Sequence, residues 1–251
     1  MSAEASATTL KTPGSPAQEL VVIGGGPAGL MAAQVLSAAG VPVRLFDGMA
    51  SVGREFLLAG RGGLNLSHSE ALEDFVGRYG EQSQVVADWL AQFGPAQVVQ
   101  WAHSLGVETF VGSSGRIFPR DLKAAPLLRA WLQQLRRSGL QLSMRHRWLG
   151  WGPQGQLLFD TPAGPRSVRA SVVVLALGGG SWSRLGSDGQ WQGILAEAGA
   201  SLWPLRPSNC GFDVSGAEGR GWSEFFRSRY AGQPFKSVSY THLRAHETRE
   251  D

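Results

Sequence analysis

The sequence predicts an α/β protein built around a parallel sheet. Three observations lead to this fold class: the apolar run Leu20–Ile23, the glycine-rich turn Gly24–Gly29 directly after it, and a second apolar run, Val43–Phe46, one helix length later. Short β-branched runs of this kind are typical of buried strands. Strand, helix and strand within about thirty residues form a βαβ unit, whose parallel strands need a right-handed crossover.

The composition supports a folded protein whose backbone approaches another group closely. The chain has 251 residues, of which 43% are hydrophobic and 17% charged, so it can bury a core. Its 34 glycines are about twice the usual share of roughly 7%. The single cysteine, Cys210, excludes an intrachain disulfide framework and a Cys-rich zinc site, and it suits a reducing compartment. We expect no metal site.

Targeting signals and strongly charged blocks are not apparent in the sequence. The longest apolar runs are far shorter than the roughly 18 residues that a membrane span needs, and the N-terminus does not resemble a secretory signal. The net charge is +3, without a block of five or six basic residues. We therefore expect a cytoplasmic protein with a small-molecule substrate, no nucleic-acid or membrane partner, and an oligomeric state that the sequence does not reveal.

The first elements follow in order. Residues 1–18 have few large apolar groups and are expected to form a disordered tail, before a domain that spans 19–189. The first helix should run from Leu30 to about Ala39, and the strand Val43–Phe46 should end at Asp47. Gly60–Ser69 is expected to be a polar, glycine-rich loop.

Helical periodicity continues after this loop. Two successive helices are predicted with inward apolar faces of Val85, Val86, Trp89, Leu90 and Phe93 in the first, and of Val98, Val99, Ala102 and Leu105 in the second. An extended piece, Val107–Phe118, precedes a third helix that should end at Gly139. This helix should bury one face, which carries Leu127, Leu128, Trp131, Leu132 and Leu135.

Strands dominate the next part of the chain. Gln141–Trp151, Gln156–Asp160 and Ser167–Leu177 predict a small β-meander that returns to a buried parallel strand. Gly186–Gly189 should open a helix that runs to about Ala198. A second, mostly β domain that binds substrate is expected to begin at residue 190, and residues 190–236 would be only its start.

The turn Gly24-x-Gly26-x-x-Gly29 carries the clearest chemistry. The first glycine permits a tight turn, the second lets the backbone approach a pyrophosphate, and the third lets helix and strand pack closely. The following helix offers unpaired N–H groups to phosphates. Asp47 stands where a carboxylate accepts hydrogen bonds from ribose hydroxyls. These features predict a Rossmann-like dinucleotide site; the alternative is a βα turn without a ligand.

Several motifs resemble one family of flavoproteins. Val21-Val22-Ile23-Gly24-Gly25-Gly26-Pro27-Ala28-Gly29-Leu30 resembles the FAD-binding opening of the glutathione-reductase-like flavoproteins. Gly53-Arg54 and the loop Ala59-Gly60-Arg61-Gly62-Gly63-Leu64-Asn65-Leu66-Ser67 resemble the HI-type, BaiN-like bacterial subgroup of NAD(P)/FAD-dependent oxidoreductases. Gly115–Pro119 and Gly178–Ser181 also match its pattern. The resemblance covers about 20–236, and the Gly60–Ser67 loop is its most specific part.

The resemblance implies FAD as cofactor and NAD(P)H as reductant. It implies that the cofactor lies against the turn residues Gly24, Gly25, Gly26, Pro27, Ala28 and Gly29, with Asp47 on the ribose. It places Arg54, Arg61, Gly62, Gly63 and Asn65 beside the pyrophosphate and the flavin edge. The alternative for the loop is an ordinary turn in which Asn65 and Ser67 act as caps.

A second flavin signature is similar to Val172–Gly179. Leu177 stands where threonine is usual, so a hydroxyl contact is lost, whereas Ala176, Gly178 and Gly179 still permit a close approach to the cofactor. The alternative is a buried strand with its turn. His68 could act as an acid or base near the flavin, but we expect an exposed loop histidine. No catalytic residue is assigned.

These features predict an FAD-dependent oxidoreductase that transfers hydride between NAD(P)H and a small-molecule substrate. The first alternative is a dinucleotide-binding fragment without turnover. The second is a flavin-dependent RNA-modifying enzyme, for which the only support is a basic patch of Arg136, Arg137, Arg145 and Arg147; a solvated helix end explains the same patch.

The last fifteen residues differ from the rest. The resemblance implies a longer chain, with a late glycine-rich segment that returns to the flavin domain and that nothing here matches. Residues 237–251 hold two of the five histidines and no glycine, and 238–248 resembles a translated sequencing adapter. We therefore expect a C-terminally truncated family member with a foreign, disordered tail. The alternative is a natural polar tail.

Overall fold

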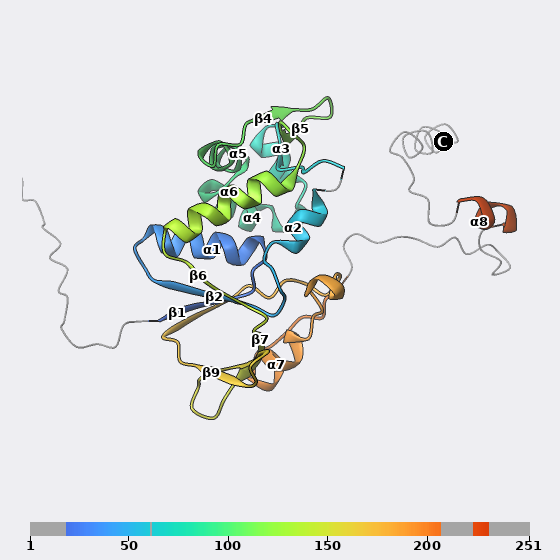
Figure 1. The fold of residues 1–251 in the computed structure, drawn as a ribbon. Coiled ribbons are helices and arrows are strands. Elements are labelled where there is room, and N and C mark those ends of the chain that lie inside the picture. Colours follow the sequence, from blue (N-terminus) through green and yellow to red (C-terminus); the bar gives the residue numbers. More distant parts are fainter. Residues whose placement is uncertain (1–18, 61, 207–222, 231–251) are drawn as a thin grey trace, which may run out of the picture. The chain divides into compact units, whose positions relative to one another are not determined.

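A computed structural model describes residues 19–60, 62–206 and 223–230 (Figure 1). The chain divides into two units, Met1–Leu205 and Arg206–Asp251. The first part of unit 1 contains, in chain order, β1 (Leu20–Ile23), α1 (Pro27–Ala38), β2 (Val43–Asp47), α2 (Arg54–Ala59), β3 (Ser67–His68), α3 (Leu72–Gly77), the 3-10 turn η1 (Gly80–Gln82), α4 (Ser83–Gln92) and α5 (Pro95–Ser104). It continues with β4 (Thr109–Val111), β5 (Arg116–Pro119), α6 (Ala124–Arg137), β6 (Gln141–Met144) and β7 (Arg147–Trp151). Its last elements are β8 (Leu157–Asp160), β9 (Arg166–Val168), β10 (Val172–Leu175), the 3-10 turn η2 (Ser183–Leu185) and α7 (Trp191–Glu197). The second unit contains α8 (Glu224–Tyr230). The predicted tails 1–18 and 237–251 lie outside the described residues.

The central sheet is parallel and has the strand order β10-β1-β2-β6. Leu20 pairs with Val43 on one side and with Val172 on the other, and the three remaining residues of β1 continue both registers. The α/β fold class and the βαβ unit are therefore confirmed. Helix α1 begins at Pro27, three residues before the predicted start, because proline has the backbone angle of a first helical turn and needs no hydrogen-bond donor there.

The sheet lies between a helical layer and a layer of strands (Figure 1). Because side chains alternate along a strand, Leu20 and Val22 face α1 and α6, whereas Val21 and Ile23 face the meander β7-β8-β9 and α7. Trp131 on α6 is 1% exposed, and its indole N–H donates to Gln34 of α1 at 2.6 Å. Each face of β1 thus has its own apolar core.

A helical insertion and a second small sheet extend the helical layer. Strands β3, β5 and β4 pair antiparallel in that order. Leu64, Ala102, Ala124 and Leu127 form the buried centre of this part. The short helices α2 and α3 lie in segments for which the sequence analysis predicts no helix.

The predicted strand Gln141–Trp151 is in fact two strands in different sheets. β6 pairs with β2 in the parallel sheet, whereas β7 pairs with β8 in the meander. Arg145 between them has a positive φ of 57°, which interrupts extended backbone. Its N–H donates to the carbonyl of Met49, and the next N–H, of His146, donates to the carbonyl of Asp47. This turn therefore brings the start of β7 to the end of β2.

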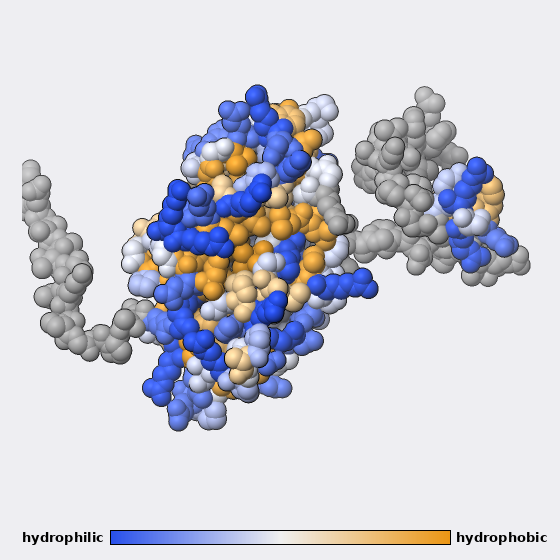
Figure 2. Space-filling model, in the orientation of Figure 1, coloured by the Kyte–Doolittle hydropathy of each residue, from blue (hydrophilic) through white to orange (hydrophobic). Residues whose placement is uncertain are grey.

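Two predictions of burial are wrong. Of the predicted inward face of α4, Val86 is buried as expected, whereas Val85, Trp89 and Phe93 are 44%, 66% and 40% exposed. Among the described strands, β10 lies at the edge of the parallel sheet rather than in its interior, and Val172 is 51% exposed. Figure 2 shows a further apolar area across the middle of the first unit, bordered by hydrophilic residues.

The division into units also differs from the expected domain boundary. It falls after Leu205, whereas the sequence analysis places it after residue 189. Ile194 and Leu195 of α7 pack on the core beneath the meander, so α7 belongs to the first unit. The described element of the second unit is a helix, α8, and the expected β structure around it lies outside the described residues. Among the described helices, none has the length and apolar character needed to cross a membrane.

Candidate functional site

A pocket of about 420 Å³ lies at the carboxyl ends of β1, β2 and β10. The chain leaves β1 toward β2 on one side, and β10 lies on the other side, so this is a topological switch point of the kind at which open α/β sheets bind ligands. Nine of the predicted site residues line the pocket: Gly24, Gly25, Gly26, Pro27, Ala28, Asp47, Arg54, Ala176 and Gly178.

The glycine turn forms one wall. Gly24 has φ +107°, and a Cβ atom there would overlap the carbonyl oxygen of Ala176 at the end of β10. A Cβ atom on Gly29 would overlap the carbonyl oxygen of Gly24, so Gly29 lies beneath the turn rather than in the pocket. Gly26 differs from both, because a Cβ atom there would meet nothing within 4 Å. The space beside Gly26 is therefore open to a ligand.

Asp47 at the end of β2 is 6% exposed, and its carboxylate accepts three hydrogen bonds from neighbouring groups. Its Oδ2 accepts the N–H of Gly25 at 2.8 Å, and its Oδ1 accepts the N–H of Met49 at 2.8 Å. Oδ1 also accepts Nη2 of Arg54 at 3.0 Å. A carboxylate offers about four acceptor positions, so one remains. The predicted contact with a ribose stays a prediction.

Arg54 is the first residue of α2 and reaches across the pocket. Gly53, in the left-handed region at φ +66°, turns the chain into this helix. Nε of Arg54 donates to the carbonyl oxygen of Leu185 at 2.6 Å, and Nη2 donates to Asp47. The guanidinium is thus held at two nitrogens, and the third, Nη1, is buried without a partner among the described residues.

Several residues around this pocket carry unpartnered polar atoms. In the described part of the chain, five buried side-chain atoms have no hydrogen-bond partner, and four of them belong to pocket-lining residues. These four are Arg54 Nη1, Glu55 Oε1, Trp148 Nε1 and Trp191 Nε1. Buried polar groups in native proteins are nearly always hydrogen-bonded, so the wall of this pocket departs from the usual pattern.

An ion pair borders the pocket on the meander side. Nη2 of Arg147 donates to Asp188 Oδ2 and to Gln190 Oε1, both at 2.7 Å. Burial would raise the pKa of Asp188, but the hydrogen bond from Arg147, the N–H of Gln190 and the Arg147 charge together lower it below its ordinary value. Arg147, part of the predicted basic patch, is therefore paired at the pocket rather than at a solvated helix end.

The sequence analysis missed Glu55, Trp148, Asp188 and Trp191 as lining residues. Glu55 directly follows Arg54, which the resemblance places beside the pyrophosphate. Asp188 lies in the turn Gly186–Gly189, for which the sequence analysis predicts only the start of a helix. Polar residues within a glycine turn next to a helix are a signal that could have identified Asp188. Trp148 gives no such signal, because its strand position alone resembles a core residue.

The other predicted site residues that the structure describes do not line the pocket. Gly62, Gly63 and Asn65 follow α2 in a loop that packs on the small sheet, where the N–H of Leu64 donates to the carbonyl of Leu122 at 2.9 Å. Gly179 is exposed. Arg61 lies outside the described residues. A place for this loop beside a flavin edge stays a prediction.

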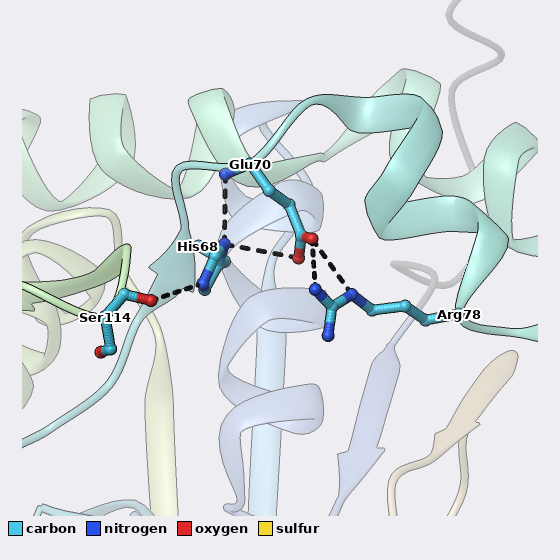
Figure 3. Close-up of polar contacts among 4 residues, drawn as sticks. All are labelled: His68, Glu70, Arg78 and Ser114. Carbon is cyan, nitrogen blue, oxygen red and sulfur yellow. Dashed lines mark hydrogen bonds and ion pairs between the residues drawn. The ribbon is translucent and has the colours of Figure 1, made fainter. Parts of the chain in front are cut away.

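His68 is a half-buried link between two segments, away from the pocket (Figure 3). Its Nδ1 accepts the N–H of Glu70 at 3.1 Å, which leaves Nε2 as the donor to the carbonyl of Ser114 at 3.0 Å. Glu70 in turn pairs with Arg78 at 2.5 Å. The ring thus connects β3 with the β4–β5 turn, a structural role in place of the fully exposed position that we expected.

Comparison with protein families gives one family model, described as the HI0933-like protein Rossmann domain, which matches residues 18–248. The match includes most of 237–251, so the foreign origin of that segment stays a prediction. A 3-dehydro-bile acid delta(4,6)-reductase of Clostridium scindens is 30% identical over 191 residues, which are 74% of this chain and 45% of that protein. The chain spans about half the length of this curated relative.

Solved structures support the fold. The open conformation of a flavocytochrome c3 fumarate reductase has a TM-score of 0.53 at 19% identity, over 64% of this chain and 34% of that chain. At this identity the similarity concerns the arrangement of the chain alone. It agrees with the arrangement of the parallel sheet described above.

Proposed function

The chain belongs to the HI0933-like protein family, and on this basis we propose that it is the cofactor-binding part of an FAD-dependent oxidoreductase. The observation that carries the proposal is the pocket at the switch point behind a GxGxxG turn, whose wall leaves open space beside Gly26. The pyrophosphate of FAD would occupy this space, where a side chain would stand in its way. The volume of about 420 Å³ lies within the usual range of ligand pockets.

Different residues of the pocket would contact different parts of the cofactor. The turn at Gly24–Gly29 and the guanidinium of Arg54 would hold the pyrophosphate, since a guanidinium forms charge-assisted hydrogen bonds with phosphate oxygens. Asp47 would keep Arg54 and the turn in position and offer its remaining acceptor site to a ribose hydroxyl. Ala176 and Gly178 would lie along the cofactor, because they place no large side chain at the end of β10.

The reaction would be a reduction of a small-molecule substrate with NAD(P)H as the hydride source. Bound flavin supplies the hydride chemistry, and the protein supplies orientation and electrostatics. The similarity to a relative named as a bile acid reductase supports a reductase.

The test is the absorption spectrum of the purified full chain, followed by titration with FAD and ADP. We expect flavin absorption in the visible range or, after loss of cofactor during purification, saturable binding of both ligands. A protein that binds neither would contradict the proposal. Bleaching of the flavin by NADH or NADPH under anaerobic conditions would identify the reductant.

A binding module without turnover is the second candidate. The matched part of the chain corresponds to 45% of the reductase. Under this alternative, the chain would bind FAD, but neither NADH nor NADPH would bleach it. The same anaerobic titration therefore separates the two functions.

A further inference from the structure

Residues 178–188 connect the end of β10 with α7 and form part of the pocket wall (Figure 1). The members of this segment that line the pocket are Gly178, Leu185, Gly186, Ser187 and Asp188. None of its residues belongs to an apolar core cluster of the described chain, and Ser187 is its one buried residue. Little burial therefore holds this part of the wall in place.

The backbone hydrogen bonds of the segment are internal. The N–H of Trp182 donates to the carbonyl of Ser187 at 3.1 Å, and the N–H of Ser187 donates to the carbonyl of Trp182 at 3.2 Å. Within the described residues, no backbone hydrogen bond joins 178–188 to another part of the chain. Gly178 at one end has φ +72°, and Gly189 after the other end has φ +71°. The segment is thus a closed turn between two glycines, which can absorb a change of backbone angle.

Two arginine side chains link this turn to other walls of the pocket. Nε of Arg54, the first residue of α2, donates to the carbonyl oxygen of Leu185 at 2.6 Å. Nη2 of Arg147, the first residue of β7, donates to Asp188 at 2.7 Å. Apart from the N–H of the neighbouring Gln190, these are the hydrogen-bond partners that the segment has elsewhere in the described chain. It therefore closes the pocket between α2 and β7.

The two links differ in burial. The side chain of Arg54 is 19% exposed, and Asp47 holds it as well. The side chain of Arg147 is 49% exposed, so water and salt screen its ion pair with Asp188. The link to β7 is the weaker one, and the segment should separate from the pocket at this side.

We propose that residues 178–188 form a lid on this pocket, which opens at the Arg147–Asp188 contact to admit and release a dinucleotide. The inference rests on the proposed function, because it concerns how the same cofactor enters the same pocket. A lid that opens more easily raises the association and dissociation rate constants together. Loss of a direct contact with the ligand instead changes mainly the dissociation rate constant.

The experiment measures both rate constants for FAD on the full chain, by stopped-flow fluorescence on mixing and on dilution of the complex. The main variant is Arg147→Gln with Asp188→Asn, which removes the ion pair and leaves the net charge unchanged. The matched control is Arg120→Gln with Glu108→Gln, which removes an exposed ion pair between residues that do not line the pocket. Melting temperatures show whether each variant is folded.

Asp188→Asn alone is the second variant. It makes the pocket more positive, so its charge by itself would slow the release of a phosphate ligand. An easier opening of the lid would speed this release. The direction of the change in dissociation rate constant therefore separates the two effects.

The main variant should raise both rate constants about threefold to fivefold, the range of an exposed ion pair, and change the dissociation constant less than about twofold. Asp188→Asn should also raise both, and the control should change neither. A change confined to one rate constant, or no change in either variant, overturns the inference, while wild-type binding of FAD still supports the proposed function. A wild-type chain that does not bind FAD overturns both.

Discussion

At the scale of single residues, the glycines of the turn have separable roles. Gly29 is required by packing, because any Cβ atom would overlap the carbonyl oxygen of Gly24. Gly26 has φ −76° and ψ −179°, a conformation that other residues adopt freely, and it has open space around it. The fold therefore tolerates a side chain at Gly26, whereas a ligand in the pocket would not.

We predict that Gly26→Val leaves the protein folded and weakens FAD binding by at least about tenfold. Two methyl groups would occupy the space into which a pyrophosphate must come, at a cost of about 1–3 kcal/mol for overpacking. The measurements are the melting temperature and the FAD dissociation constant. Gly29→Val is the matched control and should lose thermal stability as well. Undiminished FAD affinity in Gly26→Val would remove the turn from the binding site.

At the scale of elements, the pair Arg147–Asp188 connects the first residue of β7 with the turn before α7. These segments are forty-one residues apart in the sequence and meet at the pocket edge. Since the side chain of Arg147 is 49% exposed, the pair is a modest contributor to stability. Its larger effect should be on the geometry of the pocket wall.

We predict that this contact weakens in acid. The pKa of Asp188 is lowered in the folded protein, so its contribution to stability is complete above the ordinary value of 3.8 and is lost as the pH falls through the lowered pKa. Asp188→Asn should reduce the free energy of unfolding by up to about 1 kcal/mol at pH 6 and hardly at all near pH 2. Denaturant titrations at both pH values measure this. An equal loss at both would attribute the effect to packing rather than charge.

At the scale of the whole molecule, the described core is self-contained within the first unit. Both apolar clusters that hold β1 come from residues between Leu20 and Leu195, and the pocket is lined from Ile23 to Ile194. Residues beyond Leu205 belong to a separate unit. The stability of the cofactor pocket should therefore depend little on the last fifteen residues.

Deletion of residues 237–251 is the corresponding prediction. We expect an unchanged melting temperature and unchanged FAD affinity, because the composition of this segment indicates that it is foreign to the fold. Sequencing of the source locus provides an independent check. A clear drop in melting temperature after the deletion would show that the segment packs on the protein and would contradict its interpretation as a foreign tail.

Several elements are predictable from the sequence because their pattern involves only residues that are close together in the chain. β1, β2, α5 and α6 follow from apolar period and glycine or proline boundaries, and the glycine turn with Asp47 follows from spacing. Each of these depends on residues within a few positions of one another. The same applies to the resemblance, which is carried by contiguous motifs. The parallel βαβ unit and the position of the pocket behind its turn are therefore predictable from the amino-acid sequence.

Only the tertiary structure decided how distant segments meet. The division of Gln141–Trp151 into β6 and β7 depends on backbone hydrogen bonds from the Arg145 turn to the end of β2, about a hundred residues earlier. The exposure of Trp89 depends on which face of α4 finds a partner. Trp148, Asp188 and Trp191 become pocket residues because the meander and α7 fold against the ends of β1 and β2. Burial and hydrogen-bond satisfaction are properties of the assembled neighbours, so the unpartnered oxygen of Glu55 has no counterpart in the sequence alone.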